Sequence, residues 1–506
     1  MSSADTISAQ KRQGPALSAP FVSLILLAWV FVLAVWVRVN QLQSSDVGWL
    51  LSTAEWMLDG RRASIDFLEV NPPGSTLIYV PAVVLGRLSG LGSDLTNEFL
   101  VFLFAMAAAW FAAGRFAGAE SETYIRLKYV TGLLIVFLIL PSHAFTQREH
   151  VGTLCLIPWL AIAATRDQGA GILLRVIAGI GIGCAGLAKP HLVLVPAAVQ
   201  VFELYGLRSM KAFAAEILRV ENFAAGLVLM TYGGAIYFVF PDYLTNVLPR
   251  VADVYLPVRR GIFELMGFAG VRIALLLCAL SLALKNWTRP GYGSSEVFVV
   301  AAAAGILVYF IQAKGFPYQI YPAVAFGFIA FGLRLADGAY EMQGSLVRAC
   351  LAGMAVICAF LGYLYFDTRN AAEIKATARE IAKVDTSPRI LMISGDLETG
   401  FPVTRLAHGT WVQRQPFLWM AYGAYKIARD TKPHGAQLET LKRYIALERK
   451  ILAEDIVNGK PTIILIEGNR AFRWKEWAEE DPEIAGLLKG YRVASMSDWA
   501  TILQKR

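Results

Sequence analysis

Long apolar runs fill the first 366 residues of this 506-residue chain, and they limit its fold more than any other feature. A helix needs roughly 20 apolar residues to cross a hydrocarbon core about 30 Å thick. We therefore expect a membrane-spanning helix wherever an apolar run reaches about 15 to 22 residues. Eleven runs do so, at residues 20–37, 97–116, 129–145, 151–165, 171–187, 190–206, 222–241, 263–284, 296–312, 319–335 and 347–366.

Charged residues are spread unevenly between the two parts of the chain. Residues 367–506 hold 40 of the 86 Asp, Glu, Lys and Arg residues, which is about 29% of that stretch, whereas the preceding residues are about 13% charged. An ordinary soluble domain is about 25% charged. The sequence therefore predicts a polytopic α-helical membrane domain at 20–366, after an N-terminal tail at 1–19 and before a water-exposed domain at 367–506.

Basic residues between the runs favour one orientation in the membrane. With the N-terminus in the cytoplasm, the cytoplasmic loops receive Arg126 and Lys128, Arg166 and Arg175, Arg208, Lys211 and Arg219, Lys285 and Arg289, and Arg334 and Arg348. This distribution obeys the positive-inside rule. It also explains the net charge of +8 without nucleic acid as a partner. We expect an integral protein of a bacterial inner (plasma) membrane, surrounded by membrane lipids, with the C-terminal domain in the periplasm.

Two regions outside the runs have their own pattern. The first outer loop, 38–96, contains a helical spacing of apolar residues at 46–58 and a shorter apolar stretch at 76–88, which we interpret as helices at the membrane interface. In the C-terminal region, strand-like runs at 389–394 and 462–467 are separated by amphipathic helical segments near 417–429 and 437–457. This alternation predicts a small α/β domain.

Polar residues gather in the five outer loops of this topology. They are Asp46, Asp66, Glu69 and Asn71 in the first loop, Gln147, Arg148, Glu149 and His150 in the second, Lys189 and His191 in the third, Arg250, Tyr255, Arg259 and Arg260 in the fourth, and Gln312, Lys314 and Tyr318 in the fifth. A single cation at a helix end usually reaches for lipid headgroups. The presence of polar residues from all five loops at one depth favours a site where an anionic lipid reacts with a polar acceptor.

The chemistry of such a reaction requires two kinds of group. A sugar on a lipid phosphate already has a stable anionic leaving group, so Arg and Lys need only stabilise charge on the phosphate. The acceptor needs a carboxylate that takes its proton, as in an inverting glycoside reaction. Asp46 is a candidate for this base, and the alternative is that its carboxylate caps the helix that begins beside it.

Several motifs together resemble a known family. They are Asp46-Val-Gly-Trp49, Ala54-Glu-Trp-Met-Leu-Asp-Gly60, Asp66-Phe-Leu-Glu69, Asn71-Pro-Pro73, Gln147-Arg-Glu-His150, Ala188-Lys-Pro-His191 and Gln312-Ala-Lys-Gly315. In this order, after one apolar span, they resemble the membrane glycosyltransferases of the C-type (GT-C) fold. That group includes aminoarabinose transferases of lipid A and protein O-mannosyltransferases. The resemblance covers nearly all of residues 15–370.

The resemblance implies an activity and a role for individual residues. It implies transfer of a sugar from a polyprenyl-phosphate donor to an acceptor glycan, lipid or protein, with Asp46 as the base and Glu149 assisting it or binding metal. It assigns the contacts with the donor phosphate to Arg148, Lys189, His191 and Lys314. It assigns the contacts with the substrate to Asp66, Glu69, Asn71, His150 and Tyr318. Asn71-Pro72-Pro73 lacks the lysine of the commoner Asn-Lys-Pro-Pro pattern, so Lys189 or Lys314 would replace that phosphate contact.

Three alternatives stay open at this point. Asp46, Glu149 and His150 offer a partial shell for a divalent cation, but pairing of Glu149 with Arg148 or Lys189 explains the same residues. A transporter or flippase of lipid-linked saccharide would also place ionisable groups in a membrane protein, usually near mid-membrane and within paired repeats. A polysaccharide polymerase or ligase would use a glycan-lipid donor in place of a monosaccharide one.

Overall fold

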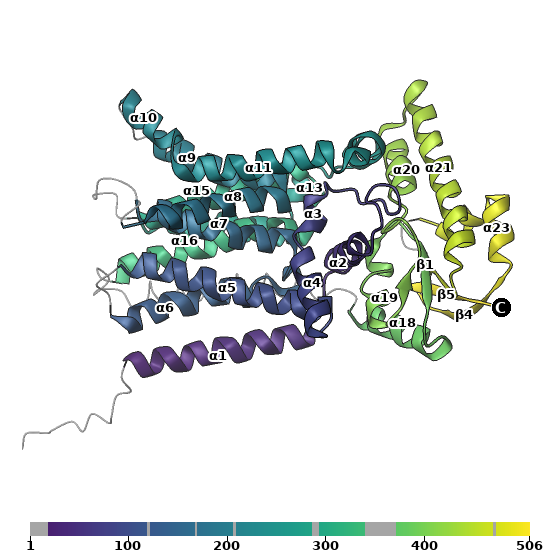
Figure 1. Cartoon of the computed structure of the whole chain (residues 1–506), viewed down its shortest axis with the longest axis horizontal. Helices are drawn as coiled ribbons and strands as arrows, with labels where there is room; N and C mark the ends of the chain where they lie inside the picture. Colours follow the sequence, from purple (N-terminus) through teal and green to yellow (C-terminus); the bar gives the residue numbers. More distant parts are fainter. Residues whose placement is uncertain are drawn as a thin grey trace, which may run out of the picture.

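The computed structural model describes residues 19–118, 122–166, 169–205, 209–285, 293–339, 371–468 and 472–506. Figure 1 shows an elongated molecule, with a bundle of nearly parallel long helices at one end and a sheet covered by helices at the other. We call the described residues of 371–506 the C-terminal α/β unit. The two parts correspond to the apolar and the charged regions of the sequence.

Apolar helices form the bundle. They are α1 (Ala19–Asn40), α5 (Ser93–Ala117), α6 (Thr123–Leu134) continued by η1 (Ile135–Ile139), α7 (Arg148–Ala164), α8 (Ile172–Ala188), η3 (Pro190–Val193), α9 (Leu194–Tyr205), α10 (Met210–Ile217), α11 (Val220–Phe238), α13 (Ile262–Met266), α14 (Ala269–Ala283), α15 (Ser294–Gln312), η6 (Pro317–Ile320) and α16 (Tyr321–Ala339). Between α11 and α13 the chain winds through η4 (Tyr243–Val247), α12 (Leu248–Arg250) and η5 (Val251–Tyr255).

Helical segments cover every expected apolar run that the structure describes, and the run at 347–366 lies outside the described residues. Within the described part, four helices are long and apolar enough to cross a membrane alone, namely Pro20–Asn40, Ser93–Ala117, Ser294–Gln312 and Pro317–Ala336. A fifth span results if Val220–Phe238 and Tyr243–Tyr255, which meet at 76°, count as one. Eleven spans are therefore not confirmed, because runs such as 171–187 form helices shorter than the roughly 20 residues needed.

Small residues let α8 pack closely between α7 and α11. A Cβ atom at Gly181 would lie 2.3 Å from the carbonyl oxygen of Cys155 in α7. A Cβ atom at Gly179 would lie at the same distance from the carbonyl oxygen of Glu221 in α11. Helices in membranes associate through such close backbone approaches. The glycines of α8 therefore fix the spacing of three bundle helices.

The first outer loop folds at the end of the bundle nearest the C-terminal α/β unit. It forms α2 (Ser45–Leu58), α3 (Gly74–Leu77) and α4 (Val80–Ser89). The expected helix at 46–58 is confirmed by α2, and Gly60, with φ of 86°, supplies the left-handed backbone just after it. The expected helix at 76–88 is broken into α3 and α4 beside Tyr79, whose hydroxyl donates to the carbonyl oxygen of Thr146.

The C-terminal α/β unit is built on a five-stranded sheet in the order β2-β1-β3-β5-β4. Its elements are α18 (Ala371–Val384), β1 (Arg389–Ile393), η7 (Leu397–Thr399), α19 (Val403–Leu406), β2 (Thr410–Trp411), α20 (Trp419–Thr431), α21 (Ala436–Gly459), β3 (Ile463–Glu467), α22 (Trp474–Glu479), α23 (Pro482–Leu488), β4 (Tyr491–Met496) and β5 (Ala500–Lys505). β1 pairs in parallel with β2 and β3, whereas β5 is antiparallel to β3 and β4. The central strands β1 and β3 are apolar and buried because both faces of the sheet are covered.

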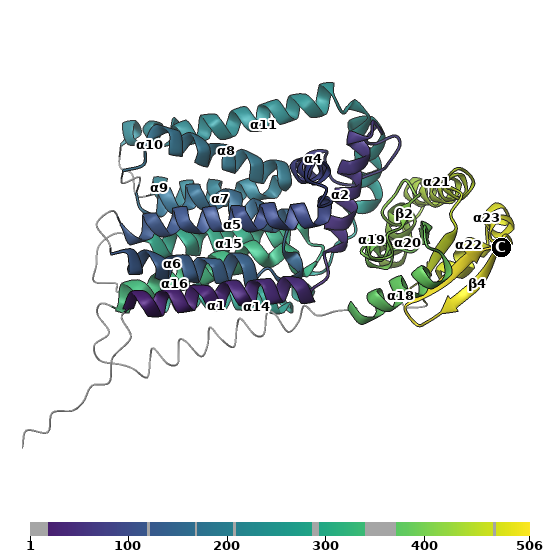
Figure 2. The same ribbon diagram turned by 60° about the horizontal axis from the view of Figure 1, so that its bottom comes forward.

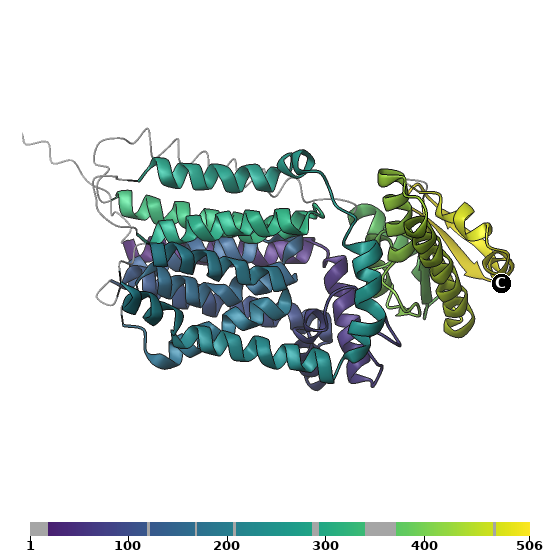
Figure 3. The same cartoon turned by 90° about the horizontal axis from the view of Figure 1, so that it is seen from above.

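The C-terminal α/β unit contacts the rest of the molecule through the first outer loop and through the segment 243–255 (Figures 2 and 3). Trp49 of α2 packs edge-on against Phe401 of the unit, with ring centroids 5.6 Å apart. The backbone N–H of Leu68 donates to the carbonyl oxygen of Arg414 at 2.7 Å. Residues of α2 and of the sheet therefore share one hydrophobic core.

Candidate functional site

Five bundle elements begin or end near the start of α2, at the end of the bundle that faces the C-terminal α/β unit. Asp46 lies in the first turn of α2, and Arg148 and Glu149 lie in the first turn of α7. Lys189 stands between α8 and η3, and Lys314 stands between α15 and η6. Residues from four outer loops of the expected topology thus occupy one end of the bundle.

Asp46 contacts two residues of the second loop. Its Oδ2 lies 4.0 Å from Nη2 of Arg148 and accepts a hydrogen bond of 3.4 Å from Nε2 of Gln147. Its side chain is 21% exposed. The N-cap of α2 is Ser44, and no backbone N–H within the described chain donates to Asp46. Among the two alternatives from the sequence, helix capping therefore has no support in these contacts.

Arg148 is a buried cation with unused donors. The residue is 2% exposed, and its Nε and Nη1 have no hydrogen-bond partner within the described part of the chain. Leaving a buried charged donor unsatisfied costs more than the about 1 to 3 kcal/mol of a neutral group. The guanidinium also presents its donors as a fork that matches a phosphate. Arg148 is thus suited to bind an anion beside Asp46.

Glu149 forms a buried ion pair in the same cluster. Its Oε1 lies 3.0 Å from Nζ of Lys189, and both side chains are largely buried. Lys189 also donates to Oε1 of Gln312 at 3.2 Å, and the same oxygen accepts from Gln319 at 3.1 Å. Glu149 therefore holds Lys189 in place and compensates its charge.

Lys314 already uses most of its hydrogen-bond donors within the protein, which the sequence did not predict. Its Nζ donates to the carbonyl oxygens of Tyr255 at 2.5 Å and Val258 at 2.7 Å. An ammonium group has three N–H donors, so one is left for a ligand. Burial lowers the pKa of Lys314 to about 8, and nearby positive charges, the largest from Arg259, act in the same direction. Lys314 is a weaker candidate for a phosphate contact than Arg148.

Glu69 and Asn71 form a buried group of their own in the first outer loop. Glu69 accepts hydrogen bonds from the indole N–H of Trp49 and from the backbone N–H of Asn71, the latter at 2.8 Å, and from the side-chain amide of Asn71. Burial raises the pKa of Glu69, while the positive charge of Arg148 opposes this rise. Trp49 and Asn71 thus already use the oxygens of Glu69.

The other expected substrate residues have different surroundings. His150 accepts from the backbone N–H of Thr146 at 3.1 Å, and its ring packs between Phe145 and Tyr321. These contacts are those of a packed core histidine.

The last three candidates differ in whether they lie near Asp46, Arg148 and Glu149. Tyr318 lies within electrostatic range of Asp46, Glu149 and Arg148. His191 is half-buried, and its Nδ1 has no partner among the described residues. Asp66 lies outside the group, because its carboxylate is 40% exposed and accepts from the backbone N–H of Arg62 at 2.7 Å. Asp66 therefore closes a turn in its own loop.

The suggested cation shell of Asp46, Glu149 and His150 is not formed. Searched over the described ranges, no group of three or more His, Cys, Asp or Glu residues is arranged to hold a metal ion. The side chain of Glu149 faces Lys189, and His150 packs between aromatic rings. These residues therefore do not fit a divalent cation as a group.

Two residues of the cluster had no assigned role in the sequence analysis. Gln147 donates to both Ser44 and Asp46. Tyr255 lies within electrostatic range of Asp46, Arg148 and Glu149. Both belong to outer loops that the sequence identified, but their positions along the chain carry no signal of the partners they contact.

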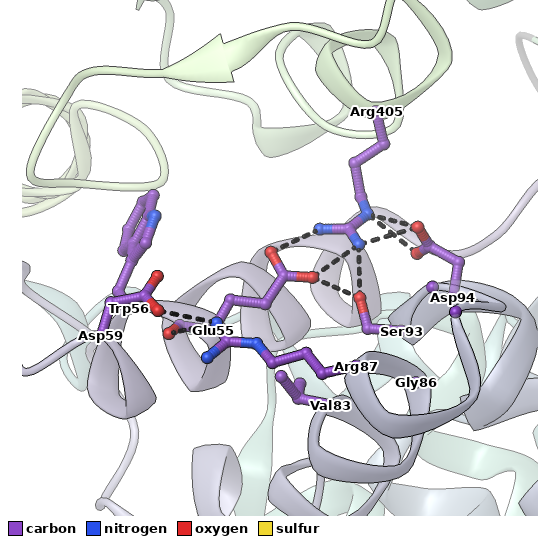
Figure 4. Close-up of a pocket in the computed structure, with 11 residues that line it drawn as sticks. Glu55, Trp56, Asp59, Val83, Gly86, Arg87, Ser93, Asp94 and Arg405 are labelled. Atoms are coloured by element: carbon purple, nitrogen blue, oxygen red, sulfur yellow. Dashed lines mark hydrogen bonds and ion pairs between the residues drawn. The ribbon is translucent and has the colours of Figure 1, made fainter.

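A hollow of about 540 Å³ opens at the other end of α2 from Asp46 (Figure 4). It is lined by Glu55, Trp56, Asp59, Arg87, Asp94 and Arg405, with several glycines. Arg87 pairs with Asp59 at 2.8 Å, and Arg405 pairs with Glu55 at 3.0 Å. Since its cations are paired, this hollow does not offer the unused donors found at Arg148.

Comparison with known proteins identifies the fold. No model of a protein family matches the sequence, and no curated protein matches it. Among solved structures, ArnT from Cupriavidus metallidurans bound to undecaprenyl phosphate has a TM-score of 0.58 and 14% identity, covering 96% of this chain and 98% of ArnT. ArnT in the apo state gives a TM-score of 0.56 at 14% identity with the same coverage.

The archaeal oligosaccharyltransferase AglB from Archaeoglobus fulgidus, in complex with an inhibitory peptide and a dolichol-phosphate, has a TM-score of 0.46 and 12% identity over 94% of this chain and 73% of AglB. ArnT and AglB are GT-C glycosyltransferases. The likeness to ArnT spans nearly the whole of both chains. It confirms the C-type fold that the sequence motifs led us to expect.

Proposed function

We propose that this protein is a membrane glycosyltransferase that moves a sugar from a polyprenyl-phosphate donor to a glycan, lipid or protein acceptor. The observation that carries the proposal is the buried, partly unpaired guanidinium of Arg148 beside the carboxylate of Asp46, which is 21% exposed. A phosphate-binding cation and a proton acceptor thus stand side by side. The fold shared with ArnT, which was solved with undecaprenyl phosphate, supports this assignment.

On the donor side, Arg148 binds the phosphate that links the lipid to the sugar. Its two unused donors would bind phosphate oxygens and stabilise the charge that develops as the phosphate leaves. Lys189, His191 and the remaining N–H of Lys314 contribute further positive charge or donors around it. Glu149 assists by holding Lys189 in place through their ion pair.

On the acceptor side, Asp46 is the general base. An acceptor oxygen or nitrogen attacks the anomeric carbon, and the bond from that carbon to the phosphate oxygen breaks. The phosphate leaves with the electron pair, and Asp46 takes the proton of the acceptor. A single displacement of this kind inverts the configuration at the anomeric carbon.

The proposed reaction takes place at the outer face of a bacterial inner membrane. This placement follows from the basic residues of the loops expected in the cytoplasm, such as Arg126 and Lys211. In this orientation the C-terminal α/β unit lies in the periplasm beside the acceptor. It would then cover the site from the water side.

Incubation of the purified protein with polyprenyl-phosphate sugars tests the proposal. We expect loss of the sugar-bearing lipid and release of polyprenyl phosphate, both followed by mass spectrometry. A flippase would instead move a lipid-linked saccharide across a vesicle membrane without consuming it. A polymerase or ligase would consume a glycan-lipid donor and leave monosaccharide donors intact, so either result would overturn the proposal.

A further inference from the structure

The guanidinium of Arg405 joins the C-terminal α/β unit to two elements at the end of the bundle (Figure 4). Arg405 lies in α19, and its side chain reaches between α2 and the first turn of α5. Its Nε donates to both carboxylate oxygens of Asp94 at 2.8 Å, and its Nη2 donates to Glu55 at 3.0 Å and to Ser93 at 3.0 Å. Its Nη1 donates to Ser52 at 2.8 Å.

These bonds use the whole donor set of the side chain. Arginine presents five N–H donors in a rigid plane, and each nitrogen of Arg405 has at least one acceptor here. Only 18% of the side chain is exposed, so its ion pairs are screened by water less than those at the surface. A lysine would supply the charge but not the planar fork.

The bonds of Arg405 hold a helix whose other end carries Asp46. Ser52 and Glu55 lie in α2, and Asp46 lies in the first turn of the same helix. Near the middle of α2, Phe401 packs on Trp49, and the Arg405 side chain passes close to Gly48. The C-terminal α/β unit therefore contacts α2 from Gly48 to Glu55.

A small rotation of α2 would move the Asp46 carboxylate away from its partners. A side-chain tip stands about 5 to 6 Å from a helix axis, so a rotation of about 20° shifts it by about 2 Å. A misplacement of about 1 Å costs on the order of a hundredfold in rate. The orientation of α2 is thus a sensitive variable for a base in its first turn.

We propose that Arg405 is a positioning residue through which the C-terminal α/β unit sets the orientation of α2, and with it the position of Asp46. Arg405 bonds to α2 at Ser52 and Glu55, beyond Asp46 along the helix, and does not contact the reacting atoms. Its effect on transfer rests on the proposed function, whereas the coupling between the unit and α2 does not.

The test compares Arg405→Ala and Arg405→Lys with Arg449→Ala in the full-length protein. Arg449 is a matched control because it pairs with Glu480 at 2.9 Å inside the C-terminal α/β unit. Hydrogen exchange of peptides from 45–58 reports the stability of α2 directly. Binding of undecaprenyl phosphate and the kcat of sugar transfer report the donor site and the base separately.

In Arg405→Ala we expect α2 amides to exchange at least about tenfold faster and kcat to fall about 10- to 100-fold, with donor binding changed less than about twofold. The exchange rate and the kcat of Arg405→Lys should lie between those of Arg405→Ala and of the natural protein. Arg449→Ala should match the natural protein in exchange rate and in kcat. Unchanged exchange of α2 in Arg405→Ala would overturn the coupling. Equal loss of protection in Arg449→Ala would overturn it as well, since a general loosening would then explain the effect.

Two further experiments distinguish a loss of the coupling from a failure to fold and from an absence of sugar transfer. If Arg405→Ala does not fold, the double variant Glu55→Gln and Asp94→Asn removes the acceptors of the same guanidinium and should give the same faster exchange. Normal exchange in that double variant would refute the coupling. If the natural protein transfers no sugar, the proposed function fails, while the exchange of α2 still decides the coupling.

Discussion

Replacement of Asp46 by asparagine removes the proposed base with little change of shape. The amide oxygen can still accept from Gln147, and the lost element is a negative charge 4.0 Å from Nη2 of Arg148. At an effective dielectric constant of 20, two unit charges at 4 Å interact by about 4 kcal/mol. Most of this is offset because the neutral amide, unlike the 21% exposed carboxylate, loses no charge hydration when the protein folds. Together with loss of a favourable helix-dipole interaction of 0.3 to about 1 kcal/mol, we expect the free energy of unfolding to fall by about 1 kcal/mol.

The expected loss of rate is much larger. General-base help contributes about 10² to 10⁴ in rate, which corresponds to about 3 to 5.5 kcal/mol of transition-state stabilisation. We therefore expect Asp46→Asn to fold, to bind undecaprenyl phosphate and to transfer sugar at least about a hundredfold more slowly. Loss of polyprenyl-phosphate sugar with time, followed by mass spectrometry, measures the rate, and thermal unfolding in detergent measures stability.

Asp66→Asn is a matched control, because Asp66 is an acidic residue of the same loop whose carboxylate bonds only within that loop. It should transfer sugar at the natural rate. Turnover of Asp46→Asn within about threefold of the natural protein would refute the role of Asp46, since a base worth 10² cannot be so nearly dispensable. An equal loss in Asp66→Asn would also refute it, because general damage to the loop would then explain both.

Three other perturbations test separate parts of the molecule. Arg148→Ala should weaken binding of undecaprenyl phosphate by about 1.5 to 3 kcal/mol, the scale of a charge-assisted hydrogen bond, and unchanged affinity in a titration would remove Arg148 from the phosphate site. Burial raises the pKa of Glu448 from 4.5 to about 7, so the folded protein binds this proton more tightly than the unfolded chain does. The resulting stabilisation, on the order of 3 kcal/mol, is complete below about pH 4.5 and is lost as the pH rises through about 7, and the melting temperature of Glu448→Gln should lack this part of the pH dependence. Reporters fused after Arg166 should report the cytoplasm and those fused after Arg506 the outer side, and a cytoplasmic C-terminus would contradict the proposed orientation.

Local patterns predicted the elements whose apolar spacing is regular. The run at 46–58 became α2, and the apolar runs at 389–394 and 462–467 became β1 and β3. The helix expected at 76–88 is broken next to Tyr79, whose hydroxyl bonds to a carbonyl of a distant loop. Such a contact depends on tertiary packing, which the local spacing of apolar residues does not encode.

The sequence also placed the polar residues at one end of the bundle, because alternate loops of a membrane protein lie on the same side. It did not predict the partner of each side chain. Lys314 bonds to carbonyl oxygens of a loop more than 50 residues away, and His150 packs on Tyr321. One sequence indicates which residue types lie at which depth in the membrane. The side-chain pairings between loops depend on how the helices pack.

The contacts of Arg405 join parts of the chain that are made at very different times. Asp94 precedes Arg405 by 311 residues, and Glu55 precedes it by 350. At about 5 to 20 residues per second, a ribosome needs roughly 15 to 70 s to cover that distance. During this interval α2 has neither Arg405 nor Phe401 against it. We therefore expect the segment that carries Asp46 to mature only after the last part of the chain has been translocated and folded, so that a nascent or truncated chain inserts in the membrane without completing its site.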